Sequence, residues 1–457
     1  MNPKLSQLVA RLAPQEWLIK HHVRIVVGLL LVQIAAVAVV WYAKRSADRE
    51  FNAAAAELTR RSVVPSEKRL LPVISGEGIT LVQTTRGVRS LVRFNNSLFA
   101  ETEGGLMELT NDGNPKRSFT MLDGLPESDL TVLAEFGSQL FIGTRSRGLV
   151  AFDGSRFTGY RWTDRKAQAV TSLLEAQGRL LVGTFAGGLL EFDGKQFREV
   201  IAEEKRLNGI ERVAVDDTRL FVCTFADGLW VNEGARWRHF TVADGLPSNR
   251  VVSVVANGEQ VLVATDFGVA AISANKLFDS ERNSFQTLAI LPTLSSMVRY
   301  GSAILVSKDN GEIFQLTPDA RKNRTSLTPF SLGHKESGSL SSCQLNVFSG
   351  EQSLWLLSNE GIRRTGWQDE RLSGGNGVHS FAETEQIPLT SNIVSAMAFD
   401  GDGKLWAGSF RNGIDVFTRE GRRLTHIETG AVREINSLVW DSGAQQMIAG
   451  TSQGLVR

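Results

Sequence analysis

Aromatic side chains recur at one position of several short turns, where contact with a ligand or partner is possible. Phenylalanine directly follows a threonine or serine at Phe185, Phe225 and Phe410, and follows it one residue later at Phe267. A turn that faces water normally carries polar residues. Two interpretations remain open: each ring packs between neighbouring structural units, or the rings form an exposed aromatic rim. A rim would suit a sugar, an apolar peptide or a protein partner.

Charged and polar residues occupy the same turns as the phenylalanines. They are Arg145, Arg147, Asp227, Asp266, Arg411 and Asn412. Loops held on a rigid scaffold are where binding residues concentrate. We therefore predict that these six residues and the four phenylalanines form a ligand-binding or partner-binding rim.

The sequence shows no pattern typical of an enzyme, a metal site or a cofactor site. The six histidines have no metal-ligand spacing with another ligand, and two cysteines exclude a disulfide scaffold. No glycine-rich loop leads from a strand into a helix, which a nucleotide-binding fingerprint requires. The 50 basic and 49 acidic side chains give a net charge of +1, so no global field would attract nucleic acid. We expect a non-enzymatic protein without metal or cofactor.

The turns belong to an internal repeat. Two or three apolar residues, a small residue, Thr or Ser, a short turn, Gly and another apolar run recur nine times. The Thr-like position falls at residues 102, 144, 184, 224, 265, 308, 358, 409 and 451. The second copy divides into four short strands at 130–136, 139–144, 148–153 and 156–162, with Asp153-Gly154 as a hairpin turn. Four antiparallel strands in each repeat indicate an all-β fold, a β-propeller of four-stranded blades.

The number of blades in the ring is less determined than the number of repeats. Nine repeats predict nine blades, and eight or seven remain possible because four to eight is the usual range. The ninth copy has no fourth strand, and a spare strand, Ile79–Thr84, lies upstream of the first copy. We predict that this strand pairs with Gly454–Arg457 and closes the ring, so that no edge strand is exposed.

A candidate membrane span precedes the repeats. Ile25–Ala43 contains no charged residue, and as a helix its nineteen residues reach about 28 Å, close to the bilayer core. A cleaved signal peptide with a site near Ala36-Val37-Ala38 is the alternative. We predict a cytoplasmic segment at 1–24, a transmembrane helix at 25–43, a helical stalk at 44–75 and the propeller at 76–457.

The linkers between repeats carry a further phrase, which supplies a family resemblance. DGLPESDL at 123–130, DGLPSNRV at 244–251 and DGDGKLWAGS at 400–409 are its clearest examples. The phrase resembles the two-component regulator propeller repeats, which build extracytoplasmic sensor halves of bacterial sensor kinases. The resemblance covers roughly residues 76–457 and is weaker in copies five to seven. A kinase domain is absent from these residues, so we expect no signalling by an attached kinase.

The resemblance and the candidate span together imply a membrane-anchored binding module. We expect a sensor-like or scaffold propeller at the bacterial cytoplasmic membrane, facing the periplasm or the exterior. Its expected partners are a protein or a small extracytoplasmic ligand, and the lipid bilayer through Ile25–Ala43. A propeller enzyme of the lyase or lactonase type and a constitutive accessory subunit of a membrane complex are the alternatives.

Overall fold

The computed structural model describes most of the chain beyond residue 63. The described residues are 64–73, 87–163, 165–257, 259–279, 284–301, 303–319, 324–329, 344–347, 353–358, 361–368, 371–373, 378–380 and 389–457. They belong to one compact unit, Val63–Arg457, while Met1–Ser62 forms another. The candidate span Ile25–Ala43 and the spare strand Ile79–Thr84 lie outside the described residues. Within the ranges above, no helix is long and apolar enough to cross a bilayer.

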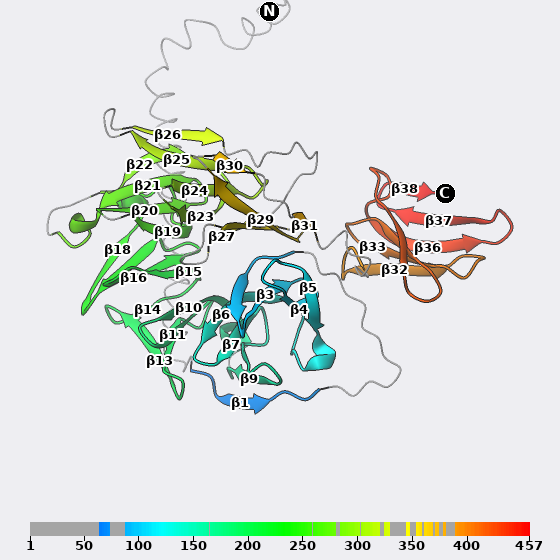
Figure 1. Cartoon of the computed structure of the whole chain (residues 1–457), viewed down its shortest axis with the longest axis horizontal. Helices are drawn as coiled ribbons and strands as arrows, with labels where there is room; N and C mark the ends of the chain where they lie inside the picture. Colours follow the sequence, from blue (N-terminus) through cyan, green and yellow to red (C-terminus); the bar gives the residue numbers. More distant parts are fainter. Residues whose placement is uncertain are drawn as a thin grey trace, which may run out of the picture. The chain divides into compact units, whose positions relative to one another are not determined.

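Nine antiparallel sheets follow one another along the chain, one for each repeat, and we call them blades 1 to 9 (Figure 1). Blade 1 contains β2 (Leu91–Phe94), β3 (Ser97–Thr102), β4 (Gly105–Leu109) and β5 (Pro115–Phe119). Blade 2 contains β6 (Leu130–Phe136), β7 (Gln139–Thr144), β8 (Leu149–Phe152) and β9 (Phe157–Arg161), with β1 (Glu67–Leu70) added beside β9. Blade 3 contains β10 (Val170–Ala176), β11 (Arg179–Thr184), β12 (Leu189–Phe192), β13 (Phe197–Ala202) and β14 (Lys205–Arg206).

The next three blades have four strands each. Blade 4 contains β15 (Ile210–Val215), β16 (Arg219–Thr224), β17 (Leu229–Glu233) and β18 (Arg236–Phe240). Blade 5 contains β19 (Val251–Asn257), β20 (Gln260–Thr265), β21 (Gly268–Ser273) and β22 (Gln286–Ile290). Blade 6 contains β23 (Leu294–Tyr300), β24 (Ala303–Lys308), β25 (Ile313–Asp319) and β26 (Arg324–Pro329).

The last three blades are less uniform. Blade 7 contains β27 (Gln344–Val347), β28 (Ser353–Ser358), β29 (Gly361–Gln368), β30 (Arg371–Ser373) and β31 (Val378–Ser380). Blade 8 contains β32 (Val394–Phe399), β33 (Leu405–Ser409), β34 (Ile414–Phe417) and β35 (Arg423–Ile427). Blade 9 contains β36 (Ile435–Asp441), β37 (Gln446–Thr451) and β38 (Gly454–Val456). Short 3-10 helices lie at Met121–Asp123, Arg165–Gln168, Val242–Asp244 and Ala274–Lys276.

The predicted strand division of the repeat is confirmed in blade 2. Its first two strands have the predicted bounds, and its last two begin and end within a residue of them. The Asp153 carboxylate accepts the N–H groups of Ser155 and Arg156, and Gly154 has a φ of 100°. Local turn chemistry therefore sets the hairpin, as the Asp-Gly pair predicted.

Blades 1 to 7 close on themselves. An apolar cluster fills each interface between consecutive blades, from blades 1 and 2 to blades 6 and 7. A further cluster joins blade 7 to blade 1 through Trp355 and Leu98. At the same interface, the Val88 N–H donates to the Ser358 carbonyl at 2.9 Å and Asn346 Nδ2 donates to the Leu91 carbonyl at 2.8 Å.

Side chains of the innermost strands carry hydrogen bonds around this closed set. Arg89, Thr131, Thr171, Arg212 and Ser253 each donate to a carbonyl in the following blade. Four of these bonds join the first strands of two neighbouring blades, and Arg89, two residues before β2, reaches the first strand of blade 2. Together they tie the blades to one another around a central channel. Between blades 6 and 7 the direction is reversed, since Gln344 Nε2 donates to the Ser295 carbonyl, and Asn346 joins blade 7 to blade 1.

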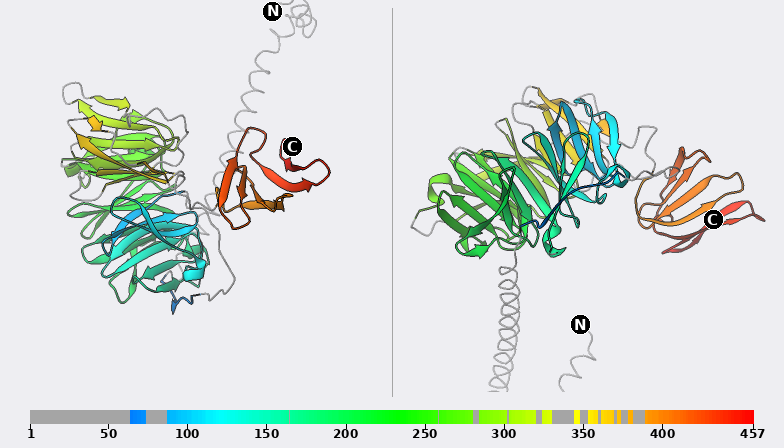
Figure 2. Two further views of the ribbon diagram at one scale, coloured as in Figure 1. Left: turned by 45° about the vertical axis from the view of Figure 1, so that its right-hand side comes forward. Right: turned by 90° about the horizontal axis from the view of Figure 1, so that it is seen from below.

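The closing contacts differ from the predicted nine-blade ring. Blades 8 and 9 share their own apolar cluster, which includes Ile414, Ile435 and Leu438 and contains no residue of blades 1 to 7. The contacts between blades 7 and 1 are thus made without blades 8 and 9. The predicted latch, Ile79–Thr84 against Gly454–Arg457, involves a strand outside the described residues and stays a prediction. Figures 1 and 2 show the two sheets of blades 8 and 9, which contain β32–β35 and β36–β38.

A short part of the predicted stalk lies among the described residues. Residues 44–75 were expected to be helical, but Glu67–Leu70 forms β1, which pairs with β9 from Glu67↔Arg161 to Leu70↔Thr158. Pro65 precedes this strand and disfavours a helix there. The rest of the predicted stalk lies mostly outside the described residues, and the boundary at residue 76 stays a prediction.

Candidate functional site

One backbone hydrogen bond recurs at the same face of successive blades. The residue after the second strand donates its N–H to the carbonyl of the residue before the first strand. The pairs are Arg145–Asp129, Phe185–Ala169, Phe225–Gly209, Asp266–Arg250 and Asp309–Thr293. In addition, the Thr144 and Thr224 hydroxyls donate to the glycine carbonyl that follows each turn, at 2.7 and 2.8 Å. These bonds hold the turns rigidly around the opening of the channel, which we call the mouth.

Three phenylalanines form an arc of the mouth. Phe185 and Phe225 come from blades 3 and 4, and their ring centroids lie 5.4 Å apart in a T-shaped arrangement. The Arg250 guanidinium lies 5.5 Å from the centre of the Phe225 ring. Phe185 is 52% exposed and Phe267, from blade 5, is 48% exposed. Rings this accessible offer apolar area to a partner.

Carboxylates surround the single guanidinium in this arc. Arg250 Nε and Nη2 donate to the two Glu211 oxygens at 3.1 and 3.2 Å. These bonds raise the pKa of Arg250, with smaller contributions from Asp266 and Asp309. Because Glu211 already neutralises Arg250, the two aspartates leave the arc negative. The Asp266 Oδ1 atom is buried and accepts no hydrogen bond from the described residues.

A second, charged arc lies at blades 1 and 2. Asp129 accepts hydrogen bonds from Arg145 Nε at 2.6 Å and Arg89 Nη2 at 3.2 Å. Arg89 Nε also donates to Glu101 Oε1 at 2.9 Å. Burial raises the pKa of the Glu101 carboxyl to about 7 and outweighs the attraction of Arg89. The mouth is therefore aromatic and acidic on one side and salt-bridged on the other.

Arg212 narrows the channel below the mouth. Its Nη2 atom donates to Gln344 Oε1 at 3.3 Å, which joins blade 4 to blade 7 across the ring. Gln344 Nε2 in turn donates to the Ser295 carbonyl in blade 6. A ligand that entered the channel from the mouth would therefore contact the polar side chains of Arg212 and Gln344.

The structure brings seven of the ten predicted residues onto the face of the ring. These are Arg145, Arg147, Phe185, Phe225, Asp227, Asp266 and Phe267, from four consecutive blades. Phe410, Arg411 and Asn412 occupy the equivalent turn of blade 8, which is outside the ring.

Two of the predicted residues are tied to local structure. Asp227 Oδ2 accepts the Trp230 indole N–H at 3.0 Å, so this carboxylate is used within blade 4. The Arg147 backbone N–H donates to Glu127, while its side chain is exposed.

Sequence reasoning missed Arg250 and Glu211. Arg250 is part of the linker phrase DGLPSNRV and directly precedes the first strand of blade 5, so its place in the phrase was a usable signal. Glu211 lies within a strand, and nothing in its own position distinguished it.

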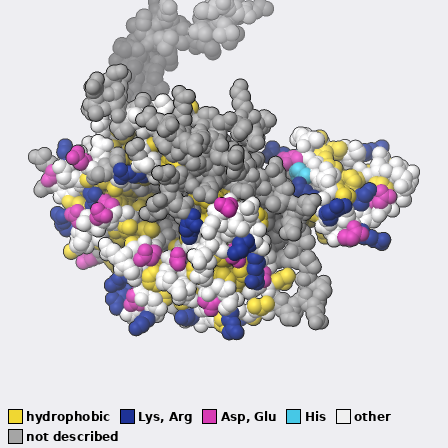
Figure 3. All heavy atoms as spheres, viewed as in Figure 1, with side chains coloured by type: hydrophobic (Ala, Val, Ile, Leu, Met, Phe, Trp, Pro, Cys, Tyr) yellow, Lys and Arg dark blue, Asp and Glu magenta, His cyan; other side chains and the backbone are white. Residues whose placement is uncertain are grey.

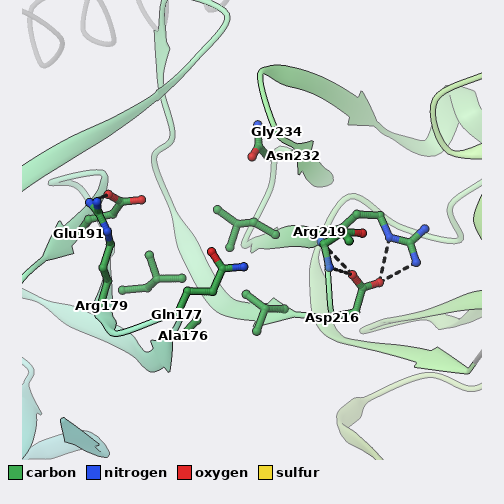
Figure 4. Close-up of a pocket in the computed structure, with 12 residues that line it drawn as sticks. Ala176, Gln177, Arg179, Glu191, Asp216, Arg219, Asn232 and Gly234 are labelled. Atoms are coloured by element: carbon green, nitrogen blue, oxygen red, sulfur yellow. Dashed lines mark hydrogen bonds and ion pairs between the residues drawn. The ribbon is translucent and has the colours of Figure 1, made fainter. Parts of the chain in front are cut away.

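A pocket on the opposite face was also missed. Its volume is about 440 Å³, and it lies between blades 3 and 4 (Figure 4). Two ion pairs lie on either side of the pocket. Arg179 Nη1 is 2.7 Å from Glu191 Oε2, and Arg219 Nη2 is 2.6 Å from Asp216 Oδ2. Figure 4 shows Gln177 between them. The pocket is formed mainly by the first hairpin turns of both blades and by Gly234 in the third turn of blade 4, which the repeat phrase does not distinguish.

The comparisons with known proteins agree with the propeller fold. Residues 388–411 match the model of the two component regulator propeller family. No curated protein matches the chain.

Among solved structures, the extracellular domain of a hybrid two component system from B. thetaiotaomicron is similar. Its TM-score is 0.50 at 14% identity, over 85% of this chain and 52% of that one. PorZ, a surface component of the type-IX secretion system of Porphyromonas gingivalis, has a TM-score of 0.47 at 13% identity, over 85% of this chain and 58% of that one. The chain thus spans about half the length of these structures.

Proposed function

We propose that this chain, which carries a two component regulator propeller repeat, is a non-enzymatic sensing or binding module that captures a partner at its mouth. The observation that carries the proposal is the arc of three phenylalanines on consecutive blades, in which Phe185 and Phe267 are exposed and Phe225 is partly buried against Phe185. Exposed aromatic rings are common anchors of binding sites, because they bury a large apolar area at small cost in conformational entropy. The family match supports a sensing role.

The charges at the arc favour a particular kind of protein partner. Asp266 and Asp309 lie near a guanidinium that Glu211 already neutralises. A protein segment with an apolar or aromatic side chain beside a basic one would complement this surface. The apolar side chain would cover the rings, and the basic group would approach the aspartates.

Capture experiments test this site directly. The full chain and a variant with Phe185→Ala, Phe225→Ala and Phe267→Ala are used to capture partners from detergent-solubilised membranes. We expect a stoichiometric partner with the wild type and a large loss with the variant. Phe410→Ala is the matched control, because Phe410 has the same turn position in blade 8. Equal capture by the wild type and the triple variant would refute the mouth as the site.

We also propose that Ile25–Ala43 anchors the protein in the bacterial cytoplasmic membrane, with the propeller on the outer side. The uncharged length of the segment supports this. The anchored protein should start at or near Met1, resist carbonate extraction and be cut by protease added to spheroplasts. A mature N-terminus near residue 39 would show cleavage and remove the anchor.

The pocket between blades 3 and 4 favours a second role, the binding of a small polar ligand. Its arginines are already paired with carboxylates, so a neutral polar molecule would fit better than an ion. A thermal-shift screen of neutral polar compounds tests this role, with Gln177→Leu as the variant that should lose the shift. If any shift survives in the variant, the compound binds elsewhere.

A further inference from the structure

One residue of the channel wall is charged where its counterparts in the other blades are neutral. The first strands of blades 1 to 7 form the wall, and each has one position opposite the residue before the Thr-like residue of the repeat. In blades 1 to 7 this position holds Ser90, Val132, Ser172, Arg212, Ser253, Ser296 and Gln344. Arg212 is the only charged residue among these seven.

The serines at this position are buried in the wall, whereas Arg212 reaches into the channel. Ser172 and Ser296 are 5% and 1% exposed, and their hydroxyls accept N–H groups of the following blade at 3.0 and 3.4 Å. Arg212 is exposed, and its contact with Gln344 joins blades 4 and 7, which are not neighbours in the ring. The Arg212 guanidinium therefore lies in the channel itself.

The partners of Arg212 are neutral. Its Nε atom donates to the Val252 carbonyl at 3.1 Å, and Nη2 donates to Gln344 Oε1 at 3.3 Å. Arg212 forms no ion pair with a described residue, because the adjacent carboxylate, Glu211, is bonded to Arg250. On the face of the molecule that Figure 3 shows, by contrast, Lys and Arg side chains lie among Asp and Glu side chains. The two neutral partners thus fix a guanidinium whose charge no described carboxylate balances.

The wall becomes apolar on the side of Arg212 that faces away from the mouth. Two residues further along the first strands, blades 1 to 6 hold what we call the apolar level, Val92, Ala134, Leu174, Ala214, Val255 and Val298. All of them except Ala134 are partly exposed. Because neighbouring blades cover both faces of a first strand, this exposed area faces the channel. Two residues of strand rise place the apolar level about 7 Å from the level of Arg212.

We propose that the channel binds a small monocarboxylate, with its carboxylate group on Arg212 and its apolar body along the apolar level. A planar carboxylate matches the fork of N–H donors on a guanidinium, and Val252 and Gln344 already hold this guanidinium in place. One positive charge balances one negative charge, whereas Asp266 and Asp309 at the mouth repel a dianion. The site is separate from the aromatic arc and does not depend on the partner proposed for the mouth.

Calorimetric titration of the full chain in a nonionic detergent tests the proposal with three probes. Hexanoate has a carboxylate and an apolar body, hexanamide replaces the charge by a neutral amide, and acetate lacks the apolar body. We expect saturable binding of hexanoate by the wild type. Hexanamide should bind at least about tenfold more weakly, because it loses the charge-assisted hydrogen bonds to Arg212. Acetate should also bind more weakly than hexanoate, because it buries less apolar area. The heat of titration into detergent alone is subtracted.

Substitutions assign the binding of hexanoate to this site. Arg212→Gln should weaken it at least about tenfold and leave the binding of hexanamide unchanged. Arg212→Lys keeps the positive charge and should bind hexanoate more tightly than Arg212→Gln. The matched control is Arg156→Gln, at an exposed arginine in a hairpin turn of blade 2, and it should bind hexanoate as the wild type does. Circular dichroism verifies that the variants keep their β-sheet.

Four results would overturn the proposal. The first is the absence of saturable hexanoate binding by the wild type. Hexanamide that binds as tightly as hexanoate would show that the guanidinium is not used, and acetate that does so would show that the apolar level is not used. Unchanged hexanoate binding in Arg212→Gln would place the probe elsewhere. The comparison of the three probes needs only the wild type, so it decides the question even if Arg212→Gln does not fold.

Discussion

At the scale of single residues, Glu101 differs most from its counterparts in the repeat. The same position holds Gly143 in blade 2, Gly183 in blade 3 and Gly408 in blade 8. The Glu101 side chain is fully buried between blades 1 and 2, and its Oε2 atom accepts no hydrogen bond in the described part of the chain. A carboxyl group in such a place favours its neutral form.

The stability of the ring should therefore depend on the protonation of Glu101. Burial raises its pKa from 4.5 to about 7 in the folded state. The folded protein binds the proton more tightly, so this contribution is complete below pH 4.5 and is lost as the pH rises through about 7. Glu101→Gln should remove up to about 3 kcal/mol of this pH dependence. Urea unfolding at several pH values measures the unfolding free energy as a function of pH. If this free energy changes with pH equally in the wild type and in Glu101→Gln, the prediction is wrong.

The phenylalanines of the mouth make a second prediction at this scale. Phe185 and Phe267 are half exposed, so Phe185→Ala and Phe267→Ala should each change the unfolding free energy by no more than ~0.5 kcal/mol. Phe152, which is buried in blade 2, is the control, and Phe152→Ala should cost about 3–5 kcal/mol. Denaturant melts compare the three variants. Costs at Phe185 and Phe267 as large as at Phe152 would favour packing between blades over a rim.

At the scale of elements, the turn between the second and third strands is the most constrained part of a blade. In blade 4 it ends at Gly228, which has a φ of 76°. A Cβ there would lie 2.1 Å from the Phe240 carbonyl oxygen, because the fourth strand passes close by. Only glycine fits this turn, and it lets the fourth strand pair along the third.

A pair of glycine substitutions separates the clash from the backbone strain. Gly234 has a similar φ of 63°, but a Cβ there would meet nothing within 4 Å. Gly234→Ala should cost roughly 1 kcal/mol from the left-handed backbone alone. Gly228→Ala should cost clearly more, because the backbone must also move. Melting curves of the two variants test this. An equal loss of stability in both would show that the fourth strand moves away to make room for the Cβ at residue 228.

At the scale of the whole molecule, the closing of the ring is the main finding. Blade 7 packs on blade 1 through Trp355 and Leu98, and Asn346 donates to the Leu91 carbonyl. Chain segments about 255 residues apart are joined there. A closed ring leaves no open blade face within it, which explains how seven repeats form a stable unit before blades 8 and 9 begin.

Removal of blades 8 and 9 should therefore leave the ring intact. A chain ending at residue 388 lacks both blades but keeps every residue of the interface between blades 7 and 1. Its main thermal transition should match that of the full chain, as seen by calorimetry. A collapse of that transition would mean that blades 8 and 9 help to close the ring.

The strands and turns of this protein follow from local patterns in its sequence. Nine repeats became nine sheets, and the Asp153-Gly154 pair set its hairpin, because strand length, alternation and turn chemistry are local properties. The turn positions that line the mouth were predictable for the same reason. Phe185, Phe225 and Phe267 lie in consecutive repeats, so any closed arrangement of the blades places them on one arc.

Which blades pack against one another, and which distant residues meet, depends on tertiary packing. The angle between neighbouring blades depends on side chains packed across the interface, and no spacing in the sequence encodes it. Closure at blade 7 separated Phe410 from the other phenylalanines. It also brought Arg212 of blade 4 to Gln344 of blade 7, a pairing between residues 132 apart. The place of Phe410 and the pairing of Arg212 with Gln344 both depend on contacts between residues far apart in the sequence, which no single repeat contains.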